Sequence, residues 1–238
     1  MRRTRPKRFI TDVSIHSKRR NRWRRWLPAM KKDLTHLLGK REIFWELQDV
    51  AKENHRILEH GSFFDWMCTN YIATAAIGIR TFADHRRDVH SLWRMLYEML
   101  EHPGVLSRRA HKAFYRGTPR FPDFDLADRS FDNIAGKGKS AISQQDIRRD
   151  LREIEDSSER VRKFANKRVA HRTPAGQLRR LPKFNELDAS MDTIDRLFCK
   201  YNLVLTASGM TSVFATRQYN WMEVLYEPWI LPGSKFRP

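Results

Sequence analysis

One amphipathic stretch, residues 143–174, constrains the fold of this chain more than any other. Its apolar or small residues recur at steps of three and four, which is the spacing of one face of an α-helix. The residues on this face are Ile147, Leu151, Ile154, Ser158, Val161, Ala165 and Val169. Ser143 is suited to cap the start of the helix, and Pro174 bars its continuation. The stretch therefore predicts one long helix with a buried face.

Other parts of the chain carry the same helical period. The predicted helices cover residues 31–59, 62–84, 91–101 and 184–208. Short polar links between them indicate antiparallel neighbours. The chain contains no strand-like run longer than four residues and no internal repeat. We therefore expect an all-α fold, an up-and-down antiparallel helical bundle.

Residues 103–142 interrupt this pattern, because three prolines and four glycines punctuate them. We expect an irregular insertion that packs Phe121, Phe124 and Phe131 on the bundle. The glycine- and lysine-rich run at 136–140 resembles a phosphate-binding P-loop. It lacks the first glycine at the required spacing and no strand precedes it, so that interpretation is excluded.

Positive charge is concentrated at the N-terminus. Residues 1–32 hold thirteen Lys and Arg against one acidic residue, which is +12 of the net +18 carried by all 238 residues. Such a charge indicates a polyanionic partner, which is RNA, another nucleic acid or an anionic membrane surface. Of these we expect RNA or another nucleic acid. We predict a basic arm over residues 1–30, followed by a helical domain over residues 31–238.

Within the arm, tryptophans alternate with cations, a combination that suits phosphate neutralisation and stacking on bases. The candidate nucleic-acid-binding residues there are Lys18, Arg19, Arg20, Arg22, Trp23, Arg24 and Arg25. The alternative is a solvated arm whose tryptophans dock on the body of the protein.

Several classes of protein are excluded. No stretch approaches the roughly 20 apolar residues that span a bilayer, and the basic N-terminus has no apolar segment typical of a secretory signal. Cys68 and Cys199 lie on helical stripes, as expected of buried thiols in a cytoplasmic protein. The scattered histidines predict no metal site, and no nucleotide-cofactor or serine-hydrolase motif occurs, so we expect no cofactor.

The candidate site lies near the end of the organising stretch. A cationic cluster surrounds one imidazole there, and it consists of Asn166, Lys167, Arg168, His171 and Arg172. The alternatives are a solvated face and a histidine that interacts with the helix dipole. Arg80 and Asp84, four residues apart at the end of another predicted helix, form a second candidate pair.

Two segments carry a resemblance to a known family. Residues 62–96, SFFDWMCTNYIATAAIGIRTFADHRRDVHSLWRML, together with residues 161–174, VRKFANKRVAHRTP, resemble the abortive-infection (AbiU-like) branch of the HEPN superfamily. The resemblance implies a helical bundle that is usually dimeric and often a metal-independent ribonuclease. It also implies an antiphage or toxin role, with a cognate antitoxin as a further partner.

The family motif is an Arg followed, often through Asn, by a His four to six residues later. Asn166 and His171 match it, but Ala165 stands where the motif has Arg, and Arg168 or Arg162 would substitute. The resemblance thus implies an RNA-cleaving site in which His171 transfers a proton and an arginine steadies the phosphate. The alternative is a non-catalytic helical module that binds nucleic acid or another protein.

Overall fold

The computed structural model describes residues 12–59, 61–115, 124–169, 181–214, 217–230 and 232–235, and within these ranges the chain forms helices and no strand. The all-α prediction is confirmed for these residues. The helices are α1 (Asp12–Glu53), α2 (Arg56–Glu59), α3 (Ser62–Phe82), α4 (Leu92–Glu101), the 3-10 helix η1 (Pro103–Val105), α5 (Arg108–Lys112), α6 (Phe124–Ala135), α7 (Gln144–Phe164), the π-helix η2 (Ala165–Val169), α8 (Phe184–Thr206) and α9 (Glu223–Tyr226).

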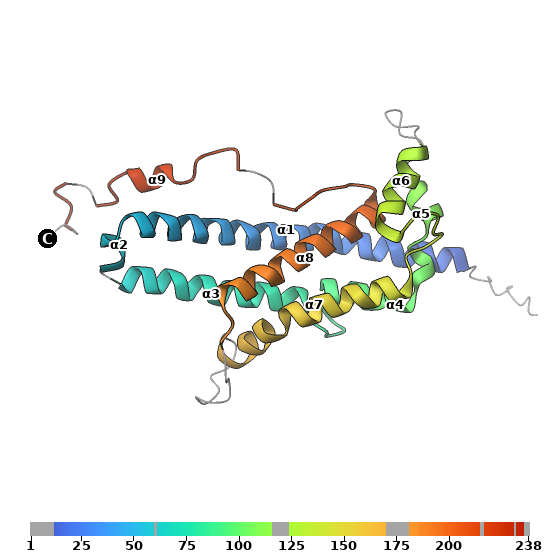
Figure 1. Cartoon of the computed structure of the whole chain (residues 1–238), viewed down its shortest axis with the longest axis horizontal. Coiled ribbons are helices and arrows are strands. Elements are labelled where there is room, and N and C mark those ends of the chain that lie inside the picture. The colour runs from blue at the N-terminus through green and yellow to red at the C-terminus, as the bar shows by residue number, and fades with distance from the viewer. Residues whose placement is uncertain are drawn as a thin grey trace, which may run out of the picture.

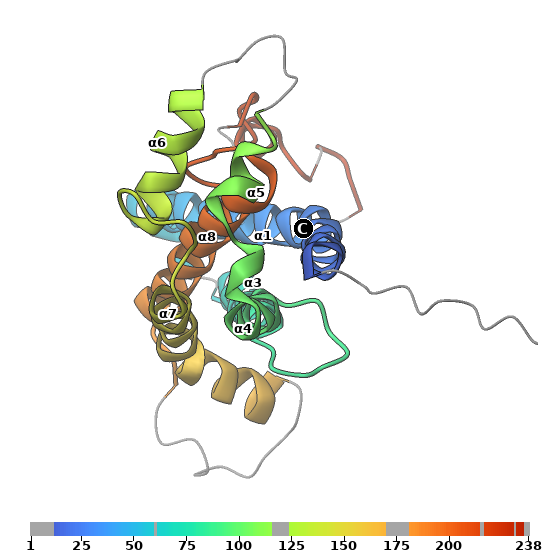
Figure 2. The ribbon, with the colours of Figure 1, turned by 90° about the vertical axis from the view of Figure 1, so that its right-hand side faces the viewer.

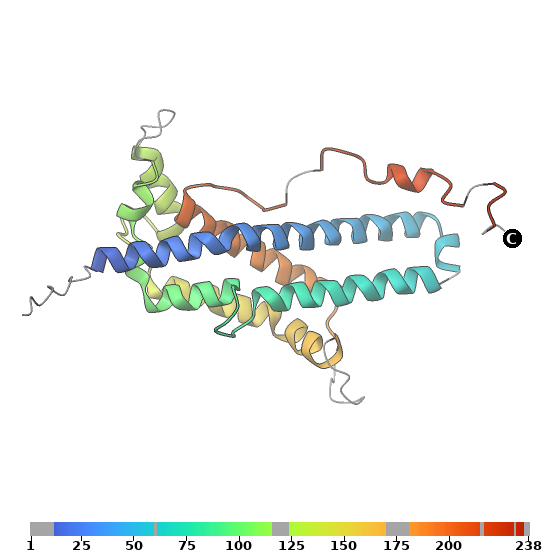
Figure 3. The same cartoon turned by 180° about the vertical axis from the view of Figure 1, so that it is seen from behind.

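Two long helices form the frame of the molecule. α1 and α3 lie side by side as an antiparallel hairpin joined through α2, and α4 continues along α1 beyond α3 (Figures 1 and 3). A Cβ at Gly78 of α3 would lie only 2.8 Å from Cδ1 of Leu37 in α1. A glycine at this position therefore permits the close approach of the two helices.

α7 and α8 cross one face of the hairpin and close the core (Figure 1). The face of α7 predicted from its period is buried, including Ile147, Ile154 and Val161. The Ser143 side chain accepts a hydrogen bond from the backbone N–H of Asp146, as the capping prediction requires. The α-helix ends at Phe164, and the predicted end at residue 174 lies outside the described residues.

The predicted boundary between an arm and a domain at residue 30 does not divide this helix. α1 runs for 42 residues through that point and includes Pro28. Trp23, Leu27 and Met30 are buried in the main hydrophobic core. The reason is amphipathicity: the two tryptophans, Leu27 and Met30 lie on one side of the helix, and basic residues lie on its other sides. Residues 12–30 are thus part of the bundle.

Residues 103–142 are more regular than predicted. They contain η1, α5 and α6, and Figure 2 views the end of the molecule where α5 and α6 lie over the end of α8. Phe131 of α6 is fully buried, as predicted. Phe121 and the side chain of Phe124 lie outside the described residues. Arg108 of α5 pairs with Asp128 and Asp132 of α6, so contacts distant in sequence order this region.

Among the described residues, none of the helices combines the length and the apolarity needed to pass through a bilayer.

Candidate nucleic-acid interface

The first half of α1 carries a basic groove on its outer surface. Because Trp23, Trp26, Leu27 and Met30 face the core, the cationic residues between them face solvent. The groove has a volume of 1140 Å³ and reaches across to the end of α8. We call it the α1 groove, and its lining residues are Lys18, Arg19, Asn21, Arg22, Arg24, Arg25, Leu27, Pro28, Lys31, Asn202 and Thr206.

Few negative charges lie close to the positive charges of the α1 groove. Its lining contains six Lys and Arg and no carboxylate. Arg22 forms an ion pair with Glu98 of α4, but within the described residues the other five cations make none. Arg24 instead lies over the ring of Phe114 at 5.0 Å. The groove is therefore suited to bind a chain of negative charges.

The two tryptophans of this segment do not lie in the groove as a stacking surface. Trp23 is fully buried, and its indole N–H donates to Glu98 Oε2 at 2.9 Å. Trp26 stacks on His90 at 4.4 Å. The prediction that Trp23 stacks on bases is therefore wrong, and the alternative, docking on the body of the protein, describes it. The predicted cations Lys18, Arg19, Arg22, Arg24 and Arg25 do line the groove, while Arg20 lines a neighbouring cavity.

The predicted pair Arg80–Asp84 is not formed. α3 ends at Phe82, so Asp84 lies beyond the helix and the four-residue spacing no longer brings the two side chains together. Asp84 accepts hydrogen bonds from the backbone and side chain of Arg86. Burial raises the pKa of Asp84, but these hydrogen bonds and the charges of Arg86 and Arg80 bring it below its ordinary value.

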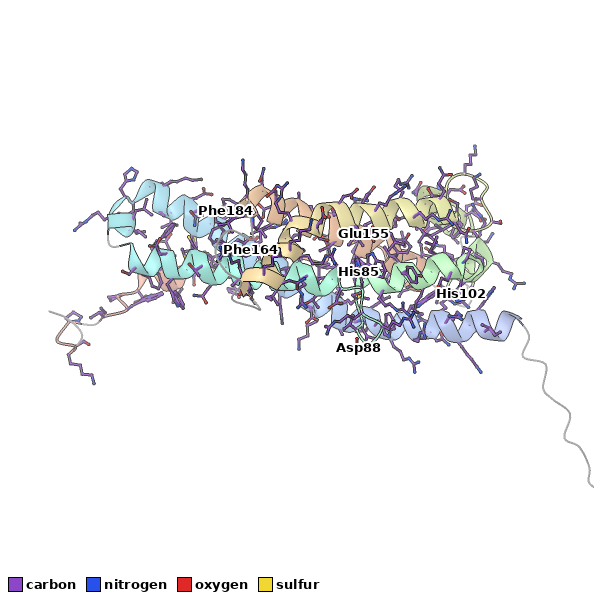
Figure 4. The ribbon with its side chains drawn as sticks, turned by 90° about the horizontal axis from the view of Figure 1, so that it is seen from below. His85, Asp88, His102, Glu155, Phe164 and Phe184 are labelled. Atoms are coloured by element: carbon purple, nitrogen blue, oxygen red, sulfur yellow. The ribbon has the colours of Figure 1, made fainter. Side chains whose placement is uncertain are left out.

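Sequence reasoning missed His85, which follows Asp84 and is exposed on the α3–α4 link. Its ring stacks on Trp93 at 3.9 Å, and the Trp93 indole N–H donates to Glu155 Oε1 at 2.7 Å. Figure 4 shows His85, on the α3–α4 link, next to Glu155 of α7. Only the tertiary structure brings these residues together, so no local signal in the sequence could have identified the cluster.

Arg162 of α7 acts on the same imidazole. Burial, and then the positive charge of Arg162, lower the pKa of His85, while Glu155 and Asp84 oppose the shift. Arg162 lies seven residues after Glu155, which is two turns along the same face of α7. Within the described residues it makes no ion pair or hydrogen bond through its guanidinium. An exposed imidazole and a guanidinium without an ion pair could together bind a phosphate ester and exchange a proton with a hydroxyl group beside it.

The motif predicted around residue 166 begins on a π-helix. η2 contains Asn166, Lys167 and Arg168, and it packs against α3. π-Helical turns are rare and often mark functional sites. His171 and Arg172 lie outside the described residues, so the convergence of His171 with Asn166, Arg168 or Arg162 stays a prediction.

No group of three or more His, Cys, Asp or Glu side chains in the described ranges is placed to hold a metal ion. Comparison with known proteins gives no assignment: no family model, curated protein or solved structure matches this chain.

Proposed function

We propose that the protein binds RNA through the α1 groove. One observation carries this proposal: six cationic side chains line a single groove on a rigid helix, and no carboxylate lies among them. Phosphate contacts of this kind release counterions from the nucleic acid, which favours binding. The helix fixes the spacing of the cations, because its other face is held in the core by residues such as Trp23 and Met30.

Charge reversal within the groove tests the proposal. The variant Arg24→Glu/Arg25→Glu changes two exposed side chains, so the fold should be retained. We expect its Kd for a labelled single-stranded RNA, measured by fluorescence anisotropy, to rise at least about tenfold. The slope of log K against log salt should fall by about 1.4, about 0.7 for each lost phosphate contact to a single strand.

A matched control lies on another surface. Arg148 and Arg152 are exposed on α7, four residues apart, and Arg148→Glu/Arg152→Glu changes the net charge by the same amount. If the control variant loses as much affinity as the groove variant, binding follows net charge and the assignment to the groove is wrong. Unchanged affinity of the groove variant would also show that the assignment to the groove is wrong.

A second proposal is that the protein is a metal-independent ribonuclease of the HEPN type, with His171 as the proton-transfer residue. The unpaired Arg162 and the π-helical turn at Asn166–Arg168 support it, since both offer donors to a phosphate. The residue resemblance also supports a homodimer with an antiphage or toxin role and a cognate antitoxin. The alternative is a module that binds nucleic acid or protein without cleavage.

An RNA-cleavage assay in the presence of a chelator separates these alternatives. We expect cleavage by the wild type and none by His171→Ala. His85→Ala belongs in the same assay, because His85 is the described imidazole that Arg162 influences. Equal cleavage by the wild type and His171→Ala would remove the role of His171, and absence of cleavage by the wild type would leave RNA binding alone.

A further inference from the structure

A separate cavity lies at the start of α1. It has a volume of 450 Å³, is partly open to solvent and is bounded by α1, η1 and α5. His16 and Arg20 enter from α1, and Arg109 enters from α5, while Gly104, Val105 and Ser107 form part of the wall. No carboxylate lines the cavity, so its polar character is almost wholly cationic.

Three side chains of this cavity are cationic or can become so. Within the described residues, none of His16, Arg20 and Arg109 makes a side-chain hydrogen bond or an ion pair. Arg20 is partly buried, and burial, followed by the charge of Arg24, lowers the pKa of its guanidinium. Holding like charges together partly out of water is unfavourable, and a bound anion would relieve this cost.

The surroundings hold a second imidazole, and the charges near it are mixed. Figure 4 shows His102 between the end of α4 and α1, close to the same end of the molecule. Burial, and then the charges of Arg19 and His16, lower the pKa of His102, whereas Glu101 and Glu98 oppose that shift. Gly104 packs closely on the cavity, since a Cβ there would lie 3.1 Å from Cε1 of His16. A larger residue would displace the imidazole, so glycine preserves the position of His16.

The cavity adjoins the α1 groove. His16, Arg20 and Arg24 follow one another at steps of four residues, which places them along one face of α1. Arg24 lines the groove, and its guanidinium lies over Phe114, just after α5. The row therefore leads from the open groove into the cavity at its end.

We infer that this cavity binds the phosphomonoester at the end of the RNA strand that occupies the α1 groove. A terminal phosphate carries a charge of about −1.5 to −2 at neutral pH and three acceptor oxygens, more than an internal phosphodiester offers. Two guanidinium groups can bind such oxygens in pairs. The inference rests on the proposed function, because the groove orients the strand toward the cavity.

The experiment uses the full chain and one internally labelled RNA sequence in three forms. One carries a 5′-phosphate, one a 3′-phosphate and one has hydroxyl groups at both ends. We expect one of the phosphorylated forms to bind about tenfold more tightly than the hydroxyl form, the effect of one or two charge-assisted hydrogen bonds. The form that gains identifies the end that the cavity accepts.

Variants assign the effect to the cavity. Arg20→Gln/Arg109→Gln should remove the advantage of the terminal phosphate, whereas Arg148→Gln/Arg152→Gln, with the same loss of charge, should retain it. Circular dichroism checks that the variants are folded. If the double variant is unfolded, Arg109→Gln alone replaces it in the test, because Arg109 is exposed and its replacement should leave the fold intact. Retention of the full advantage by a folded cavity variant would overturn the inference.

The possible outcomes distinguish failure of the cavity inference from failure of the groove proposal. Equal affinity for all three RNAs, with a loss in Arg24→Glu/Arg25→Glu, overturns the terminal-phosphate site and leaves the groove proposal standing. Binding of a phosphorylated RNA without binding of the hydroxyl form contradicts the groove proposal, and it overturns the inference that a strand held in the groove places its end in the cavity. Absence of binding for every form overturns both.

Discussion

The α1 groove and the corner formed by α5 and α6 are both rich in cations, but they differ in what faces those cations. In the corner, Arg108 pairs with Asp128 and Asp132, and Lys112 pairs with Asp128. In the groove, only Arg22 has a carboxylate partner within the described residues, Glu98. Guanidinium groups thus hold two helices together in one region and stay available to a ligand in the other.

This difference has an electrostatic counterpart. Hydrogen bonds from Lys112 and Arg108 lower the pKa of Asp128, and a hydrogen bond from Arg108 lowers that of Asp132. The corner is therefore internally neutralised over most of the pH range. The number of basic residues alone therefore does not distinguish the two regions, whereas the absence of facing carboxylates in the groove does.

The largest expected effect concerns the scaffold beneath the groove. Trp23→Ala removes a fully buried indole and its hydrogen bond to Glu98. We expect the free energy of unfolding to fall by about 3–5 kcal/mol, measured by urea denaturation followed by circular dichroism. Trp23→Phe, which keeps most of the volume, should lose less. A loss below about 0.5 kcal/mol for Trp23→Ala would mean that this segment is a detached arm.

A smaller change in the free energy of unfolding is expected when one arginine from each region is replaced. Arg108→Ala breaks the contacts with both aspartates of α6, so it should destabilise the protein. Arg24→Ala removes an exposed side chain without a carboxylate partner and should change the free energy of unfolding by no more than about 0.5 kcal/mol. Thermal denaturation of the two variants measures the difference. If Arg24→Ala were the more destabilising, the distinction between binding and structural arginines would be contradicted.

The smallest effect is a pH dependence of the corner. His111 of α5 is buried, with Nε2 at 3.1 Å from Ser130 Oγ. Burial, and to a lesser extent the charge of Arg108, lower its pKa, although a hydrogen bond to the Val204 carbonyl opposes the shift.

Because the folded pKa is below the unfolded one, the unfolded state binds the proton more readily. Stability is then greatest above about pH 6.5, the ordinary value, and decreases as the pH falls through it. Urea denaturation at several pH values measures this decrease, and His111→Gln should reduce it. An identical pH profile in the variant would contradict the assignment to His111.

Much of the fold follows from local sequence. The predicted helices at 62–84, 91–101 and 184–208 correspond to α3, α4 and α8, because a clean apolar period and short polar links mark them. The cap at Ser143 could be predicted in the same way, since its partner, the backbone N–H of Asp146, is close in sequence. Contacts within one turn or one face of a helix are what a single sequence encodes most directly.

What the sequence did not reveal depends on distant partners. The first half of α1 resembles a basic arm in composition. Its structural role becomes evident only in the folded chain, where Glu98 accepts a hydrogen bond from Trp23 and forms an ion pair with Arg22. Likewise, α5 and α6 are ordered by Arg108 and the carboxylates of α6. Most of the groove cations were predicted, whereas the His85–Trp93–Glu155 cluster joins three separate elements and could not be.

Pro28, in the wall of the α1 groove, bears on which nucleic acid the proposed interface would prefer. Proline has no backbone N–H, so the carbonyl oxygen of Arg24, one turn earlier, lacks its usual helical donor. Beside its six cationic donors, the groove thus contains a backbone carbonyl whose helical donor is missing. Phosphate oxygens cannot use this acceptor, but a hydroxyl or amino group can, and a ribose 2′-hydroxyl is the feature that distinguishes RNA from DNA.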